Sequence, residues 1–174
     1  MMKDILKCDK CNLCNNQPPL LDNCKDNADV FWVGLSAKKV KSEMFSYPLA
    51  SDTNSGKLIL EIEKMLPKVI FYKTNIVKCL PLSDNNKLRY PTNSEIYSCI
   101  PNLIKEIEVL KPKIIFLLGK LVANSFNDYI KRSNLTFNEC KILEIKHPSY
   151  ICVYKKGELN NYKNEIIEFI GDFL

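Results

Sequence analysis

The chain has 174 residues, 46% of them hydrophobic, and its 25 Lys and Arg residues against 20 Asp and Glu give a net charge of +5. This length predicts one domain whose core is large enough to fold without disulfides. No apolar run approaches the roughly 18–20 residues of a membrane span, and the polar start is unlike a signal peptide, so we expect a cytoplasmic protein with reduced thiols. The modest positive charge permits a polyanionic partner without requiring one.

Strand and helix patterns alternate along the chain. Apolar and β-branched runs predict strands at 29–34, 69–77, 113–119 and 141–146, and apolar residues at helical spacing predict helices at 56–66, 94–110, 120–130 and 159–174. Ser55 is the expected cap of the first helix, and Thr92-x-x-Glu95 forms a capping-box pattern before the second. The alternation predicts an α/β fold in a single domain over residues 1–174: a three-layer sandwich whose four-stranded, mostly parallel sheet is flanked by helices.

Cysteines suggest a metal site. Cys8-x-x-Cys11 lies in an aperiodic, Cys-rich segment, residues 1–27, whereas Cys79 and Cys99 stand far apart in the sequence. A close pair with two ligands from distant elements is typical of a [4Fe–4S] cluster, and four cysteines also suit zinc. The plain alternative is that Cys79 and Cys99 are small buried hydrophobic residues. We interpret the other cysteines as follows: Cys14 and Cys24 as spare ligands, Cys140 and Cys152 as core thiols.

The chain has one histidine, which opens the segment His147-Pro148-Ser149-Tyr150 just after the last predicted strand. A single histidine is usually a surface or capped residue. In α/β proteins, however, ligands bind outside the carboxyl ends of the strands. We therefore expect His147 to stand at the functional edge of the sheet.

The order and spacing of these motifs closely resemble those of the iron–sulfur uracil-DNA glycosylases of families 4 and 5. The motifs follow one another as Cys8-x-x-Cys11, Val33-Gly34-Leu35-Ser36-Ala37, Thr74-Asn75-Ile76-Val77-Lys78-Cys79-Leu80-Pro81, Arg89-x-Pro91-Thr92-x-x-Glu95-x-x-x-Cys99-x-Pro101, Lys111-Pro112-Lys113 and His147-Pro148-Ser149-Tyr150. The resemblance covers roughly residues 8–155, and its most specific parts are the segments that begin at Asn75 and at His147.

The resemblance implies that the partner is DNA and that uracil, or a related damaged or modified base, is flipped out and cut from its sugar by hydrolysis. It implies that Asn75 reads the base edge, since an amide both donates and accepts, and that His147 stabilises charge on the departing base. A turn or capping role is the alternative for Asn75. The other residues assigned by resemblance are Gly34, Leu35, Ser36, Ala37 and Leu49 around the base, Ser149 on the DNA strand, and Cys8, Cys11, Cys79 and Cys99 on a [4Fe–4S] cluster, whereas Lys38 is assigned to the DNA strand by its charge.

The chain departs from the family 4 pattern in two places. Leu35 stands where family 4 has a glutamate, and the next carboxylate is Glu43, so the loop is closer to that of family 5. Leu49 replaces the phenylalanine whose ring stacks on the base, which leaves Phe45 or Tyr47 to supply a ring.

These departures keep two further hypotheses open: a catalytically silent module that binds a base or a nucleic acid strand, and an enzyme with an altered base preference. Lys38 begins a lysine-rich loop that either grips phosphates or is simply solvated. We expect a monomer that does not associate with membranes.

Overall fold

The computed structural model describes residues 2–23 and 26–174. The elements follow in chain order as α1 (Met2–Leu6), η1 (Leu13–Asn15), β1 (Val30–Ser36), η2 (Glu43–Phe45), α2 (Asn54–Met65), β2 (Phe71–Val77), α3 (Asn93–Leu110), β3 (Ile114–Leu118), α4 (Lys120–Ser133), β4 (Lys141–Ile145), α5 (Pro148–Tyr154), η3 (Lys156–Glu158) and α6 (Leu159–Phe173). Among the described residues, no helix combines the length and the hydropathy that crossing a membrane requires.

The strands form one parallel sheet of four strands in the order β2-β1-β3-β4. β1 and β3 are apolar over most of their length because both faces of a parallel sheet are covered by helices. The register places Gly34 of β1 beside Asn75 of β2, and Leu118 of β3 beside Ile145 of β4. The carboxyl ends of all the strands therefore meet at one edge of the sheet, as the predicted α/β fold requires.

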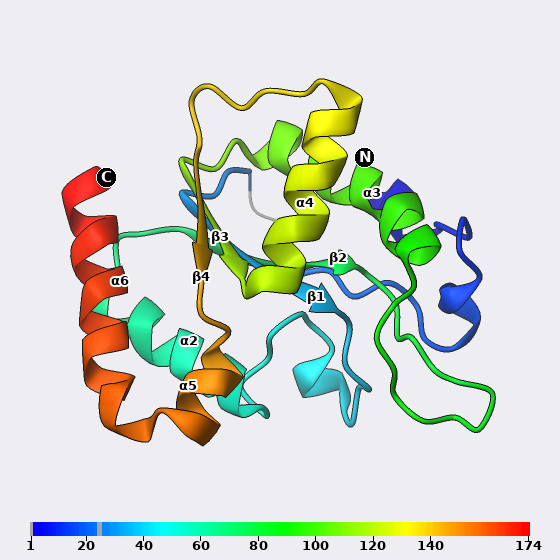
Figure 1. Ribbon diagram of the computed structural model, residues 1–174, viewed down its shortest axis with the longest axis horizontal. Helices are drawn as coiled ribbons and strands as arrows, with labels where there is room; N and C mark the ends of the chain where they lie inside the picture. Colours follow the sequence, from blue (N-terminus) through cyan, green and yellow to red (C-terminus); the bar gives the residue numbers. More distant parts are fainter. Residues whose placement is uncertain (1, 24–25) are drawn as a thin grey trace.

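Two layers of helices cover the sheet (Figure 1). On one face, α3 and α4 pack on Phe31 and Val33 of β1. On the other face, α2, α5 and α6 pack on Val30 and Trp32, the alternate residues of the same strand. This alternation along β1 confirms the predicted three-layer sandwich, because successive side chains of a strand point to opposite faces.

The helix starts test the capping predictions. The capping box of Thr92 and Glu95 is confirmed, with both of its hydrogen bonds present at the start of α3. Ser55 as the cap of α2 is wrong. Thr53 caps this helix, its Oγ1 accepting the Gly56 N–H at 3.1 Å, because it is Thr53 that has extended backbone while Ser55 already lies in the first turn. The short helix α5 was not predicted, since seven residues are too few for a periodic pattern.

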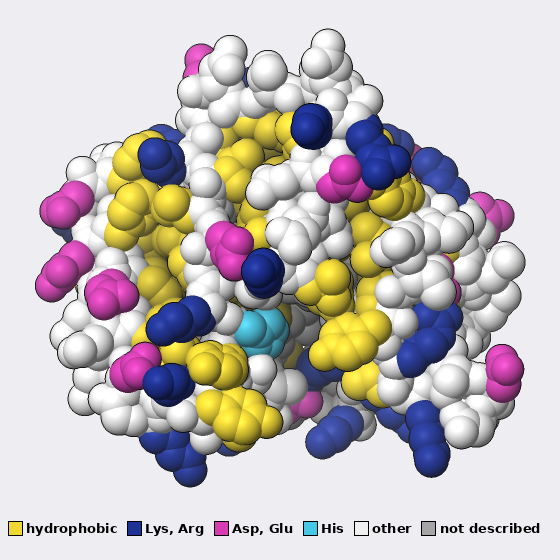
Figure 2. Space-filling view, in the orientation of Figure 1, with side chains coloured by type: hydrophobic (Ala, Val, Ile, Leu, Met, Phe, Trp, Pro, Cys, Tyr) yellow, Lys and Arg dark blue, Asp and Glu magenta, His cyan; other side chains and the backbone are white. Residues whose placement is uncertain are grey.

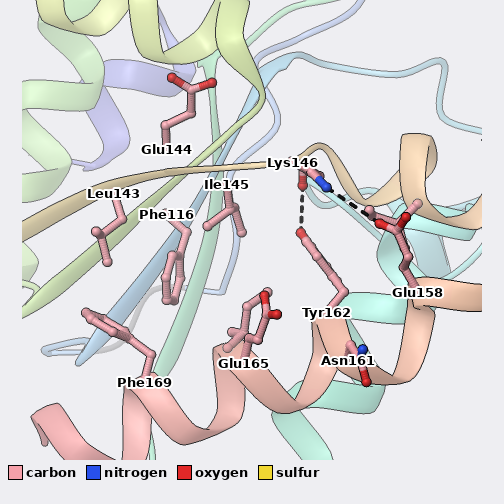
Figure 3. A pocket seen from close by; sticks show the side chains of 12 residues that line it. Phe116, Leu143, Glu144, Ile145, Lys146, Glu158, Asn161, Tyr162, Glu165 and Phe169 are labelled. Atoms are coloured by element: carbon pink, nitrogen blue, oxygen red, sulfur yellow. Dashed lines mark hydrogen bonds and ion pairs between the residues drawn. The ribbon is translucent and has the colours of Figure 1, made fainter. Parts of the chain in front are cut away.

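A groove of about 470 Å³ runs between β4, at the edge of the sheet, and α6. Its floor is apolar, with Phe116, Ile145 and Phe169 among the lining side chains (Figure 3). The Tyr162 hydroxyl donates to the Lys146 carbonyl at 2.7 Å, which ties α6 to the end of β4. The groove therefore lies between the edge strand β4 and the closing helix α6, and the hydrogen bond of Tyr162 joins these two elements.

Candidate functional site

A second cavity, of about 690 Å³, opens at the carboxyl edge of the sheet. Figure 2 shows this hollow beside the histidine, coloured cyan, with hydrophobic side chains on both sides of it. Its walls come from six segments: the end of β1, Leu49, Asn75, the loop before α3, the end of β3 with the start of α4, and His147 with the start of α5. The sheet thus brings together residues that are far apart in the sequence.

Gly34 and Asn75 form the floor of the cavity. They are paired neighbours on β1 and β2, and a Cβ atom at position 34 would collide with the Asn75 Oδ1. Asn75 is buried, and in the described part of the chain its side-chain amide has no hydrogen-bond partner. Its donor and its acceptor are therefore both available to a molecule in the cavity.

His147 stands on the opposite wall as the N-cap of α5. Its Nδ1 accepts the Ser149 N–H at 3.1 Å and lies 2.8 Å from the Ser149 Oγ. Because Nδ1 accepts a backbone N–H, the proton of the neutral ring is on Nε2. Burial lowers the pKa of His147, so the ring is neutral at pH 7. The site therefore presents a neutral imidazole with one N–H to donate.

Gly119, at the end of β3, makes room for this ring. Its φ is +94°, a conformation that other residues rarely adopt, and a Cβ there would lie 3.3 Å from the His147 Cβ. Its N–H donates to the Ile145 carbonyl at 2.8 Å, which fixes the turn against the end of β4. The position of His147 is thus set by its own helix cap and by the neighbouring strand.

The remaining residues predicted for the base and the strand divide into two groups. Leu35, Ser36, Leu49 and Ser149 line the cavity. Ala37 does not line it; its N–H donates to the Val77 carbonyl at 3.0 Å, because the pairing with β2 continues past the end of β1. Lys38 also lies outside the cavity lining, and its ammonium forms an ion pair with Asp52.

Of the two rings proposed to replace the missing phenylalanine, only that of Tyr47 belongs to the described side chains. The Phe45 side chain lies outside the described part of the structure. Tyr47 is not part of the cavity lining, and the Lys73 ammonium lies 5.9 Å from the centre of its ring. Glu43 is exposed on η2 and also lies outside the lining. None of the described residues that line the cavity is Asp or Glu.

The loop before α3 supplies lining residues that the sequence analysis missed, namely Leu88, Arg89 and Tyr90. Arg89 is held by Glu95, whose two carboxylate oxygens accept from the guanidinium at 2.8 and 2.6 Å. The Arg89 guanidinium holds the pKa of the Glu95 carboxyl below its usual range. In the sequence, only the pattern Arg89-x-Pro91-Thr92-x-x-Glu95 indicated this ion pair.

Five cysteines come together where the end of β2 meets α3 and the N-terminal segment. Cys79 and Cys99 are buried, and burial raises the pKa of Cys79 to about 12, with smaller contributions from four other thiols. These four, in decreasing order of effect, are Cys99, Cys11, Cys14 and Cys8. All five are free of disulfides. Cys24, the other spare candidate, lies outside the described residues.

Hydrogen-bond donors surround this group of sulfur atoms. The Asn102 amide donates to the Cys8 Sγ at 3.4 Å and to the Cys99 Sγ at 3.9 Å, and the Lys78 N–H donates to the Cys99 Sγ at 3.4 Å. N–H groups that point at sulfur favour thiolates, the form that binds metal. Within the described residues, however, no three Cys, His, Asp or Glu side chains converge as ligands of one metal ion do.

A buried ion pair lies between the cavity and the cysteines. The Lys78 Nζ donates to the Glu106 Oε2 at 2.5 Å, to the Thr74 Oγ1 at 2.5 Å and to the Asn75 carbonyl at 2.6 Å. Glu106 also accepts from the hydroxyls of Thr74 at 2.8 Å and of Tyr72 at 3.2 Å. Lys78 thus contacts the backbone of the cavity residue Asn75 with its side chain, and Cys99 with its main chain.

Comparisons with known proteins identify the family to which this chain belongs. A family model described as the uracil DNA glycosylase superfamily matches residues 21–171. A type-4 uracil-DNA glycosylase of Sulfurisphaera tokodaii is 34% identical over 108 residues, which are 60% of this chain and 45% of that protein. Those of Archaeoglobus fulgidus and Thermotoga maritima are each 30% identical, over 71% and 69% of this chain and 60% and 66% of their own length.

The chain therefore spans about half to two thirds of the length of these relatives. Among solved structures, wild-type SMUG2 of Pedobacter heparinus superposes with a TM-score of 0.59 at 16% sequence identity. The superposition covers 84% of this chain and 76% of that chain, so the two share a fold.

Proposed function

Because this chain belongs to the uracil-DNA glycosylase superfamily, we propose that it hydrolyses the N-glycosidic bond of uracil, or of a related base, in DNA. One observation carries the proposal. The unpartnered amide of Asn75 and the imidazole of His147, whose Nε2 holds the proton, line the same cavity at the end of the sheet. One group can read a base edge, and the other can donate to an oxygen of the departing base.

The chemistry would rest on the departure of the base. When the bond from the sugar to the base breaks, its electron pair stays on the base as negative charge. The neutral His147 ring can donate a hydrogen bond from its Nε2–H to that charge without itself carrying a positive charge. Water then adds to the sugar and loses a proton, which neutralises the departed base. Because no carboxylate of the described residues lines the cavity, stabilisation of the leaving base would carry more of the rate than activation of water.

The DNA strand would pass over the same edge. Ser149 lines the cavity beside His147, which supports its predicted contact with the strand. Lys38 is less well placed, since a phosphate would have to replace Asp52 as its partner. A target base must leave the stack to reach the floor of the cavity at Asn75.

We further propose that Cys8, Cys11, Cys79 and Cys99 hold a [4Fe–4S] cluster, with Cys14 as a near neighbour. The five thiols and the N–H groups directed at them fit this donor set. Four cysteines also suit a zinc ion, which is the alternative occupant of this site. When bound, the cluster would tie the N-terminal segment to the domain.

The test is an excision assay with the full chain, purified without oxygen. Oligonucleotides that carry uracil, hypoxanthine or a modified cytosine are incubated with the protein, and abasic sites are revealed by alkaline cleavage. We expect uracil to be released, and Asn75→Asp to weaken the preference for uracil, because a carboxylate lacks the amide donor. A chain that binds uracil-containing strands but releases no base would instead be a silent binding module, an alternative supported by the lack of a carboxylate among the described residues that line the cavity.

A further inference from the structure

Exposed apolar side chains gather at the mouth of the cavity. Leu88 is 66% exposed, Tyr90 77% and Leu121 47%, and all three line the opening. Soluble proteins seldom concentrate large apolar side chains at one exposed place unless that place binds something. Figure 2 shows hydrophobic side chains beside the hollow. The mouth of this cavity thus offers an apolar rim to a ligand.

The loop that carries Tyr90 is held in place. The Arg89 guanidinium donates to the Leu82 carbonyl at 2.9 Å, to the Tyr90 carbonyl at 3.0 Å and to both oxygens of Glu95. Glu95 in turn belongs to the capping box that starts α3. The main chain of Tyr90 is therefore fixed to the helix, while its side chain projects into solvent.

Several exposed or half-buried tyrosines of this chain pack their rings against another ring or a cation. Tyr97 packs on Tyr129, Tyr150 on Tyr154, and Tyr47 lies under Lys73. In the described part of the chain, no ring or cation packs against Tyr90, and its hydroxyl forms no hydrogen bond. A large ring kept unpaired at a cavity mouth is available to stack on an incoming ring.

Apart from Tyr90, the described residues that line the cavity provide no flat apolar surface. Leu49 provides an aliphatic side chain, and besides His147, Tyr90 is the aromatic side chain among the described lining residues. We propose that Tyr90 is the residue that stacks on the target base, closing the cavity from the side of the loop before α3. This inference rests on the proposed function, because it requires the base to be held at Asn75.

Affinity for a strand that cannot be cut provides the test. A single-stranded oligonucleotide with one 2′-fluoro-deoxyuridine is titrated with wild type, Tyr90→Leu and Tyr90→Phe, and a strand with cytosine in its place serves as reference. Binding is followed by fluorescence anisotropy. Because removal of one stacking ring costs about 1–3 kcal/mol, Tyr90→Leu should weaken uracil binding roughly 5- to 150-fold, whereas Tyr90→Phe should retain it.

Tyr154→Leu is the matched control, since Tyr154 is 74% exposed but does not line the cavity, and it should bind like wild type. If wild type prefers uracil and Tyr90→Leu binds equally well, the stacking role is refuted while the proposed function stands. Equal losses in Tyr90→Phe and Tyr90→Leu would assign the effect to the hydroxyl and also refute stacking. If wild type does not prefer uracil over cytosine, the proposed function fails, and the role of Tyr90 fails with it.

Discussion

The buried pair of Lys78 and Glu106 yields the sharpest prediction on stability. The side chains are 1% and 0% exposed, and the pair also organises Thr74 and the Asn75 carbonyl. Lys78→Met fills a similar volume but removes the charge and its three hydrogen bonds. The Glu106 carboxylate would then be buried with only hydroxyl donors. Leaving one charge of a buried pair without its partner lowers the free energy of unfolding by about 3–5 kcal/mol.

This cost converts into a measurable shift. In a domain of this size, 1 kcal/mol lowers the unfolding temperature by about 2–4 °C, so Lys78→Met should unfold roughly 6–20 °C below wild type. Circular dichroism during anaerobic heating provides the assay. Arg132→Met is the control: its ion pair with Asp128 is exposed to solvent, so this variant should unfold close to the wild-type temperature.

A double variant separates the ion pair from simple packing. Lys78→Met with Glu106→Leu buries no unpaired charge, so it should be more stable than the sum of the two single losses predicts. Losses that simply add would show that the two residues act independently. A Lys78→Met protein that unfolds within about 2 °C of wild type would refute the assignment of a strongly coupled pair.

Three other predictions concern the site and the cysteines. His147→Ala should lower the single-turnover excision rate by about 10²-fold or more, whereas Glu43→Gln, outside the cavity lining, should change it less than about twofold; equal effects would contradict the mechanism. Cys79→Ala should purify without the iron of the proposed cluster, measured against protein concentration, while Cys140→Ala should keep it, because Cys140 is not one of the four proposed ligands. The unfolding temperature should fall as the pH drops below about 6.5, because burial lowers the pKa of His147 in the folded chain and the unfolded chain then binds more protons. His147→Gln should weaken this fall, and an unchanged pH profile would count against His147 as its source.

The periodic part of the fold was open to prediction from the sequence. Apolar runs and helical spacing located the sheet strands and the helices from α2 onward, except for the seven-residue α5. Parallel pairing places Asn75 and His147 at the same edge of the sheet; the position of His147 after the last strand predicted this edge, whereas Asn75 was assigned by the family resemblance.

Contacts that depend on loops escaped prediction. Tyr90 lies in a segment that has neither a helical nor a strand pattern. Its position at the cavity depends on the ion pair between Arg89 and Glu95. The ion pair of Lys38 with Asp52 forms only when two aperiodic segments meet. Ala37 was expected at the base, but its N–H donates to the Val77 carbonyl. The sequence does not show how far the hydrogen bonding between two strands continues.

Because Gly34 fits closely against Asn75, the positions that line the cavity differ in how well they tolerate substitution during evolution. A side chain at position 34 would displace the amide, so a new specificity cannot begin there without losing the old one. Leu49 and Tyr90 stand on walls where other side chains can be accommodated. Libraries that vary these two positions and hold Gly34 and Asn75 constant should therefore yield altered base preference, whereas libraries centred on Gly34 should yield inactive proteins.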